Sequence, residues 1–319
     1  MSANSSKAYL NYQKGRQKLY PGCCSALFSN TEERLEEATN CFKEAGDLYI
    51  LDKNYKEAAK CFTECALIKQ ANKENPCEYY EQAMTCYKKV NDNENYYDVL
   101  TKLIENNITF ANFNLAGKFC MKRGELNILL EQNNNAIDDY ETALKYFQMD
   151  MNSSKFDINK CYLKKADLLI MNNIDNYNEE IDEALSIYEE IGDKCNEIGG
   201  MGSFVNNAYF KNVLCNLYYK DSILSVAFLH KFEEKSNEFK NSVEDSFLNK
   251  LLKYFNEDED ENENELISIE SLTDLFIEYK SKFNNIESYW VNVFMNKLED
   301  KIKKIIKQKP NFAEEEDFK

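Results

Sequence analysis

The sequence predicts an all-α protein: a tetratricopeptide-like, right-handed solenoid of long antiparallel helix pairs that ends in a C-terminal helical bundle. Three observations support this fold class. The 319 residues include only nine glycines and three prolines, fewer than sheet-rich folds with many tight turns use. From about residue 32 onward, apolar residues recur at helical spacing. The pattern then repeats along the chain, as expected of a solenoid whose units contact mainly their neighbours.

The first helix pair is predicted over residues 35–70, with a turn at Asp52-Lys53-Asn54. A small residue followed four positions later by an aromatic one then recurs, as Ala38/Phe42, Ala58/Phe62, Ala83/Tyr87, Ala136/Tyr140 and Ala184/Tyr188. Alanine lets two helices approach closely while the aromatic ring fills the adjacent space, so each pair predicts a packed helix–helix seam. Two such helices make a unit longer than the ~34 residues of a tetratricopeptide repeat.

Polar stretches, most of them rich in asparagine, predict the turns between helices. They are ANKENP (71–76), NDNEN (91–95), ENN (105–107), QNNN (132–135), MNSS (151–154), MNNIDN (171–176) and EIGG (197–200). The acidic stretch 256–265 predicts a loop between late helices. Two closing helices are expected within 266–283 and 287–309.

Charge and cysteine usage narrow the function classes. A net charge of −17 disfavours a general role in nucleic-acid binding, which needs a positive field. No apolar run approaches the length of a membrane span, and the polar start of the chain lacks a signal peptide, so we expect a cytoplasmic protein. Of eleven cysteines, seven lie on apolar helical stripes: Cys41, Cys61, Cys65, Cys86, Cys120, Cys161 and Cys215. We therefore expect reduced, buried thiols rather than disulfides or a zinc site.

No catalytic pattern stands out in the sequence. GGMG at 199–202 follows a predicted helix and lacks a following Lys-Ser/Thr, so a turn is a better interpretation than a phosphate loop. The single histidine, His230, lies in a helical stretch and is expected at the surface. We expect no enzyme, no cofactor and no metal.

Several stretches resemble the soluble NSF attachment proteins of the alpha/beta branch. These are the helix pair 35–70, NKCYLK (159–164), EALSIYEEIG (183–192), and an ending with Trp290, KIKKII and EEEDFK. The resemblance implies an adaptor that binds assembled SNARE complexes. It would recruit and stimulate the AAA ATPase NSF for SNARE disassembly in vesicle fusion and membrane traffic.

The resemblance also implies partners and a location. The expected partners are the SNARE four-helix bundle, formed by syntaxin, SNAP-25-type and synaptobrevin-type proteins, and the NSF hexamer. The protein would be a monomer alone, with several copies in the full assembly, and would associate peripherally with endomembranes. A generic tetratricopeptide-type scaffold or co-chaperone is the alternative, but neither the short repeat nor a carboxylate-clamp pattern is found.

Basic residues form the SNARE-binding surface that the resemblance implies. The matching positions are Lys88, Lys89, Lys118, Lys160 and Lys164. Lys160 and Lys164 lie four residues apart and hence on one helical face, off the apolar stripe that includes Tyr162. Ordinary solvated lysines are the alternative. The family's arginine is replaced here by Asn112, so binding at that point would be weaker or would shift to Lys122 and Arg123.

A short apolar loop is implied as the membrane contact. The matching residues are Cys23, Cys24, Leu27 and Phe28, where the two cysteines replace the family's aromatic pair. This replacement leaves two interpretations: a weaker loop that relies on SNARE tethering, or S-acylation of the adjacent cysteines.

Acidic residues near the C-terminal end form the implied NSF contact. The matching positions are Asp221, Glu257, Glu314, Glu315, Glu316 and Asp317, with Phe318 where the family keeps the leucine that stimulates the ATPase. Lys253 stands where an acid is expected. The expected regions are an N-terminal helix with the membrane-apposed loop (1–31), a twisted sheet of helical hairpins (32–240), and a C-terminal bundle with the acidic tail (241–319).

Overall fold

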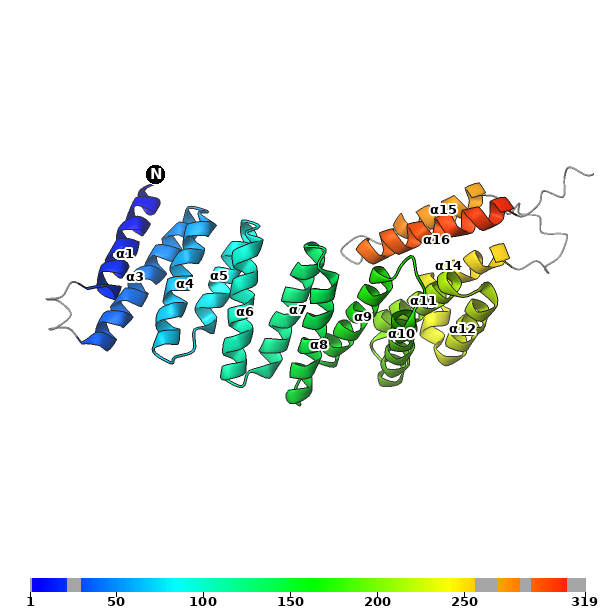
Figure 1. Cartoon of the computed structure of the whole chain (residues 1–319), viewed down its shortest axis with the longest axis horizontal. Helices are drawn as coiled ribbons and strands as arrows, with labels where there is room; N and C mark the ends of the chain where they lie inside the picture. The colour runs from blue at the N-terminus through cyan, green and yellow to red at the C-terminus, as the bar shows by residue number, and fades with distance from the viewer. Residues whose placement is uncertain (1, 22–29, 256–268, 282–287, 309–319) are drawn as a thin grey trace, which may run out of the picture. The chain divides into compact units, whose positions relative to one another are not determined.

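The computed structural model describes residues 2–21, 30–255, 269–281 and 288–308, and every regular element in these ranges is a helix (Figure 1). This confirms the predicted all-α class. The chain divides into two compact units, 1–161 and 162–319, with the division inside helix α9. Boundaries at residues 31 and 240 remain predictions.

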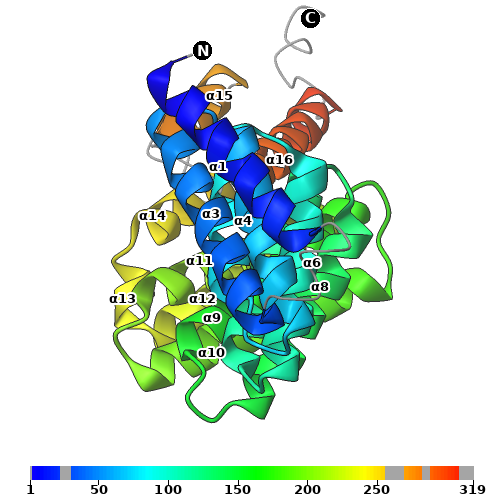
Figure 2. The same ribbon diagram turned by 90° about the vertical axis from the view of Figure 1, so that its left-hand side faces the viewer.

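Unit 1 is a row of consecutive antiparallel helices. They are α1 (Ala3–Leu19), α3 (Thr31–Leu51), α4 (Tyr55–Ala71), α5 (Cys77–Lys89), α6 (Asn93–Thr109), α7 (Phe113–Leu129), α8 (Asn133–Met149) and the first turns of α9 (Lys155–Asn172). From α1 to α8, each helix packs against the next described one, and the view from the N-terminal end shows α1 lying beside α3 (Figure 2). Such nearest-neighbour packing is the defining feature of a solenoid.

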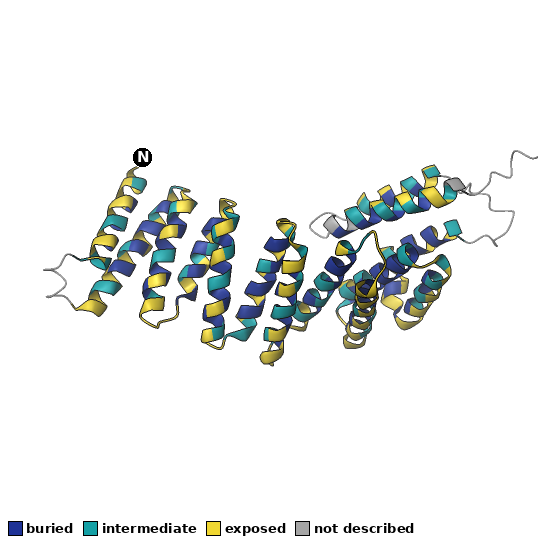
Figure 3. Cartoon of the chain, in the orientation of Figure 1, coloured by how far each residue is buried: buried dark blue, intermediate teal, exposed yellow. Residues whose placement is uncertain are grey.

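The predicted alanine–aromatic seams are confirmed. All ten residues of the five pairs are buried, none more than 5 % exposed, and in unit 1 the buried residues lie on the sides of the helices that face their neighbours (Figure 3). Glycines also allow close contacts between helices, which the alanine–aromatic pattern did not predict. A Cβ on Gly46 of α3 would lie 2.8 Å from Phe62 Cζ of α4, and one on Gly117 of α7 would lie 2.7 Å from Phe147 Cε1 of α8. These glycines let an aromatic ring lie directly on the backbone of the preceding helix.

Five turns of unit 1 share one backbone geometry. Each contains a non-glycine residue with positive φ: Lys53, Lys73, Asn91, Ala111 and Glu131, all between 53° and 60°. In each turn the next residue donates a long hydrogen bond back into the preceding helix, as from Asn54 N to Tyr49 O (2.8 Å) and from Asn112 N to Asn107 O (2.8 Å). This is the Schellman ending of a helix, and it confirms the predicted turn at residues 52–54.

The predicted turn at ENN (105–107) is wrong, because α6 runs through it. Asn106 Nδ2 donates to Lys102 O (2.8 Å), and Asn107 Nδ2 donates to Leu103 O (2.8 Å). Both asparagines are buried, and the bonds to carbonyls one turn back give their side-chain NH₂ groups partners inside the helix. The chain turns four residues after Asn107, at Ala111.

Unit 2 is built around one buried helix. After the rest of α9 it contains α10 (Glu179–Ile198), α11 (Gly202–Tyr219), α12 (Ser222–Lys235), α13 (Asn237–Lys240), α14 (Val243–Leu252), the 3₁₀ helix η1 (Lys253–Phe255), α15 (Ile269–Ser281) and α16 (Ser288–Gln308). Helix α11 packs against α10, α12, α13 and α14. The two closing helices are confirmed as α15 and α16, whereas the predicted loop 256–265 lies outside the described residues.

A buried charge network holds the centre of unit 2. Lys211 Nζ of α11 lies 2.8 and 2.9 Å from the two carboxylate oxygens of Asp167 on α9. Tyr188 of α10 donates to the same carboxylate (2.7 Å), and the ammonium lies 4.9 Å from the ring centroid of Trp290 on α16. Because each charged group has close partners, the network joins four helices without an uncompensated buried charge.

The cysteines on the apolar stripes pack as small core residues. Six of the seven are buried and Cys41 is partly exposed. Burial raises the pKa of Cys65, Cys120 and Cys161 to about 12, which keeps these thiols protonated at neutral pH. Among the described residues, no three or more His, Cys, Asp or Glu side chains gather as a metal ion would require. None of the described helices is both long and apolar enough to span a membrane.

Candidate partner-binding surfaces

Two of the predicted SNARE-binding lysines lie on a mixed-charge strip between α7 and α9. We define the α7–α9 strip as Lys118, Lys122 and Glu125 of α7 with Asp157 and Lys160 of α9. The three α7 residues follow at intervals of four and three and therefore share one face. Lys118 Nζ lies 3.9 Å from Asp157 Oδ2, and Lys160 Nζ lies 3.0 Å from Glu125 Oε1. The strip thus carries three lysines and two acids.

These ion pairs leave the lysines accessible. The side chains of Lys118 and Lys160 are 46 % and 36 % exposed, and those of Asp157 and Glu125 are 21 % and 49 % exposed. Solvent-exposed pairs of this kind contribute only about 0–1 kcal/mol. A partner that offers better-placed carboxylates can therefore displace the acids of the strip. Lys122, also exposed, lies 5.0 Å from the Phe119 ring.

Lys88 and Lys89 lie elsewhere, in the last turn of α5. Helices α5 and α7 run in the same direction, so the C-terminal end of α5 and the N-terminal half of α7 lie toward opposite edges of unit 1 (Figure 1). Both lysines are exposed, and Lys89 Nζ lies 4.6 Å from the ring centroid of Tyr55. The structure therefore does not bring them together with Lys118. Lys164 lies one turn after Lys160 in α9 and is partly exposed.

Arg123 is held within unit 1 and is poorly placed to stand in for the missing family arginine. Its Nε and Nη2 donate to Asp139 Oδ1 (2.9 and 2.6 Å), and its Nη1 donates to Thr101 Oγ1 (3.1 Å). Asn127 Nδ2 donates to the other oxygen of Asp139 (2.8 Å). With a side chain 18 % exposed, Arg123 joins α6, α7 and α8 from within. Asn112 occupies the N-cap position of α7.

Asp221 begins helix α12 as its N-cap. Its Oδ1 accepts the backbone N–H of Leu224 at 2.7 Å, and the residue is exposed. A carboxylate at this position both satisfies a free N–H group and interacts favourably with the helix dipole. The predicted NSF-binding acid therefore has a local structural role as well. Lys253, where the family has an acid, is the first residue of η1 and is exposed.

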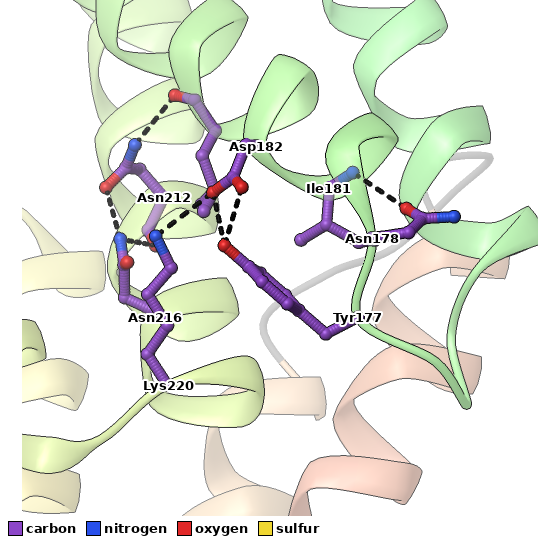
Figure 4. A network of polar contacts seen from close by, with 8 residues as sticks. Tyr177, Asn178, Ile181, Asp182, Asn212, Asn216 and Lys220 are labelled. Atoms are coloured by element: carbon purple, nitrogen blue, oxygen red, sulfur yellow. Dashed lines mark hydrogen bonds and ion pairs between the residues drawn. The ribbon is translucent and has the colours of Figure 1, made fainter.

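A polar network organises the surface next to Asp221 (Figure 4). Lys220 Nζ donates to Asp182 Oδ1 (3.1 Å), and the Tyr177 hydroxyl lies 2.6 Å from each Asp182 oxygen. The Tyr177 hydrogen bond, aided by Lys220, lowers the pKa of Asp182. Behind it, Asn216 Nδ2 donates to Asn212, whose own amide donates to a carbonyl of α10. Lys220 is thus held by an acid of its own chain.

The remaining predicted residues lie outside the described parts of the chain. They are the loop residues Cys23, Cys24, Leu27 and Phe28, and the acids Glu257, Glu314, Glu315, Glu316 and Asp317 with Phe318. The helices on either side of residues 23–28 are described. Helix α1 ends at Leu19, and Asn30 caps α3 by accepting the N–H of Glu32 (3.1 Å).

The sequence analysis did not identify Glu125 and Asp157, the two acidic residues of the α7–α9 strip. Glu125 lies seven residues after Lys118, which places both on one helical face, and that spacing is visible in the sequence. What the sequence does not show is that α9 lies against this face with Asp157 and Lys160 opposite.

Comparison with known proteins shows which family this sequence matches. Residues 6–280 match the profile of the family described as "Soluble NSF attachment protein, SNAP". The chain is 27 % identical over 240 residues to the alpha-soluble NSF attachment protein of Saccharomyces cerevisiae, covering 74 % of this chain and 79 % of the relative. It is 24 % identical over 260 residues to the human alpha protein, covering 81 % of each. It is 26 % identical over 231 residues to the bovine beta protein, covering 72 % and 74 %.

A solved structure supports the fold alone. A signal-transduction ATPase from Pyrococcus horikoshii with a tetratricopeptide repeat sensor superimposes with a TM-score of 0.53 and 12 % identity. The match covers 93 % of this chain and 44 % of the other. It confirms the tetratricopeptide-like architecture of the predicted solenoid.

Proposed function

The chain belongs to the soluble NSF attachment protein family, and we propose that it is the adaptor that binds assembled SNARE complexes and recruits and stimulates NSF for their disassembly. The observation that carries this proposal is the family match over residues 6–280, supported by relatives named for NSF attachment across most of the chain. A generic scaffold or co-chaperone would not account for a match of this extent. An adaptor needs binding surfaces rather than a catalytic constellation.

The SNARE-facing part of the proposal rests on the α7–α9 strip and Lys164. Three exposed or partly exposed lysines of the strip stand out in a chain of net charge −17. A bundle with acidic side chains would exchange the weak internal pairs of Lys118 and Lys160 for its own. Binding should therefore weaken as ionic strength rises.

The NSF-facing part rests on Asp221 and the acidic C-terminal tail. Glu257 and the tail residues Glu314 to Phe318 complete the proposed contact by family resemblance. The membrane contact through residues 23–28, association with endomembranes, the SNARE classes and several copies per assembly belong to the same proposal.

Charge reversal on α9 tests the SNARE contact. Lys160→Glu with Lys164→Glu should reduce affinity for a pre-formed SNARE complex at least tenfold, because it places new carboxylates beside Glu125 and against the partner. Conversely, Glu125→Gln should tighten binding by two- to threefold by releasing Lys160 from its internal acid. The affinity is measured by titrating a labelled SNARE complex with the protein at two salt concentrations.

A matched control separates this effect from net charge. Lys14→Glu with Lys43→Glu makes the same change at exposed positions of α1 and α3. If this control weakens binding as much as the α9 variant, or if the α9 variant binds normally, the SNARE contact is assigned to the wrong surface.

A further inference from the structure

Five large apolar side chains are exposed around two neighbouring turns of unit 1. We define the α6–α9 patch as Phe110, Leu115, Met149, Met151 and Phe156, which are 38, 42, 60, 101 and 52 % exposed. They flank the α6–α7 and α8–α9 turns, along the lower side of unit 1 in Figure 1. Single exposed apolar residues are ordinary, whereas a group of this size marks a place where a partner binds.

The two turns are held together. Asn114 Nδ2 near the start of α7 donates to Ser153 Oγ between α8 and α9 (3.2 Å). The rings of Phe113 and Tyr146 stack with their centroids 6.5 Å apart. The patch is therefore one preformed surface and not two independent loops.

Lysines surround the patch. Lys118 lies three residues after Leu115 on α7, and Lys145 lies four residues before Met149 on α8, so each shares a face with an apolar residue of the patch. Lys155 directly precedes Phe156, and all three lysines are exposed.

The acids near the patch are less available than these lysines. Asp157 lies 3.9 Å from Lys118. Asp150 is partly buried, and its Oδ1 accepts the N–H of Asn152 at 2.9 Å. Glu141, one turn behind Lys145, is also partly buried. The three lysines are exposed and these three acids are partly buried, so the accessible charge around the exposed Met and Phe side chains comes mainly from cations.

This chemistry fits a lipid surface. Met and Phe side chains can enter the boundary between headgroups and acyl chains, while lysines extend their ammonium groups toward anionic headgroups. The antiparallel order of the helices also favours a lipid surface, because it brings another exposed aromatic residue to this edge. The end of α1, with Tyr20 68 % exposed, and the start of α3 lie on the same edge of unit 1 as the patch (Figure 1).

We propose that the α6–α9 patch docks onto an anionic bilayer surface, as a membrane contact separate from residues 23–28. With it, one edge of unit 1 lies against the membrane. The proposal goes beyond the adaptor role, and its test needs neither SNAREs nor NSF.

The test is flotation of the full chain with phosphatidylcholine vesicles with and without 30 % phosphatidylserine. The background is Leu27→Ser with Phe28→Ser, so that binding at residues 23–28 does not mask the patch. On this background, Met151→Asp with Phe156→Asp should lower the vesicle-bound fraction at least fivefold. The matched control, Leu51→Asp with Leu129→Asp, alters side chains 69 and 70 % exposed at the opposite edge and should leave it unchanged.

A second pair of variants keeps the test valid if the aspartates disturb folding. Lys145→Glu with Lys155→Glu should lower binding to the phosphatidylserine vesicles at least threefold and abolish its salt dependence. Unchanged vesicle binding in both pairs would overturn the proposal. So would normal vesicle binding by the Met151→Asp, Phe156→Asp variant together with lost self-association in sedimentation or lost SNARE binding in detergent, because the occupant would then be a protein.

Discussion

At the scale of single residues, the same side-chain type has different roles according to what faces it. Lys160 meets Glu125 at the surface in a pair that a partner can displace, whereas Lys211 is enclosed by Asp167 and Trp290. The first lysine can bind a partner, and the second holds helices together. A basic residue is therefore a binding candidate only where the structure leaves it accessible.

Asp221 allows the charge and the helix cap to be separated. Asp221→Asn keeps an oxygen that can accept the Leu224 N–H but removes the negative charge. Its stability should stay within about 0.5 kcal/mol of wild type, while recruitment of NSF to SNARE-bound protein should fall three- to tenfold. Asp221→Ala should lose the charge and, in addition, about 1 kcal/mol of stability. Thermal unfolding and an NSF pull-down measure the two effects.

Asp92 provides the control for this prediction. It caps α6 in the same way, its Oδ1 accepting the N–H of Asn95 (3.3 Å). Asp92→Asn should leave NSF recruitment unchanged. Normal recruitment by Asp221→Asn would remove Asp221 from the NSF contact and leave it as a helix cap.

Sequence reasoning at this scale was reliable for apolar residues and less so for buried polar ones. Phe42 and Tyr140 could be assigned to the core because apolar periodicity is a local property of the chain. Asn107 and Arg123 could not, because their burial depends on partners in other helices, Cys77 and Asp139. A polar residue alone in a sequence predicts exposure, and only the fold shows what satisfies it.

At the scale of elements, the repeated Schellman turns give unit 1 its regularity. Five helices end on a non-glycine residue in the left-handed conformation, where glycine is usual. A Cβ costs roughly 1–2 kcal/mol in that conformation, so each of these turns has room for stabilisation.

Ala111→Gly should therefore stabilise the protein. Removing the Cβ relieves the left-handed strain at φ 56°, and the extra entropy of glycine in the unfolded chain offsets about 0.5–1 kcal/mol of that gain. The expected net gain is about 0.5–1 kcal/mol, seen as a higher midpoint in urea unfolding.

The same substitution in a helix should act in the opposite direction. Ala71→Gly, at the exposed last residue of α4, should cost about 0.5–1 kcal/mol. If Ala111→Gly also destabilises, the left-handed strain at this turn does not limit stability.

At this scale, the helices and their order could be predicted from the sequence. Contacts between helices that are not consecutive could not. The Ala/aromatic spacing identified seams between consecutive helices. It contained no information on the register of α7 against α9, and hence none on the pairing of Lys118 with Asp157. That register depends on packing across an intervening helix.

At the scale of the whole molecule, the protein is an acidic adaptor with locally basic surfaces. Family membership over residues 6–280 gives the adaptor role, and the α7–α9 strip with Lys164 is its proposed SNARE contact. The strip is not a uniform basic surface, because Glu125 and Asp157 lie within it. The partner should therefore be bound with moderate, salt-sensitive affinity and released readily after disassembly.

The most direct measurement of the central claim is SNARE disassembly with cognate partners. A fluorescently labelled SNARE complex is mixed with NSF hexamers and Mg-ATP, and separation of the labels is followed with and without the protein. We expect disassembly that requires both the protein and ATP hydrolysis, and at most a tenth of the wild-type rate with the Lys160→Glu, Lys164→Glu variant. Failure of the wild-type protein to support disassembly with cognate SNAREs and NSF would contradict it.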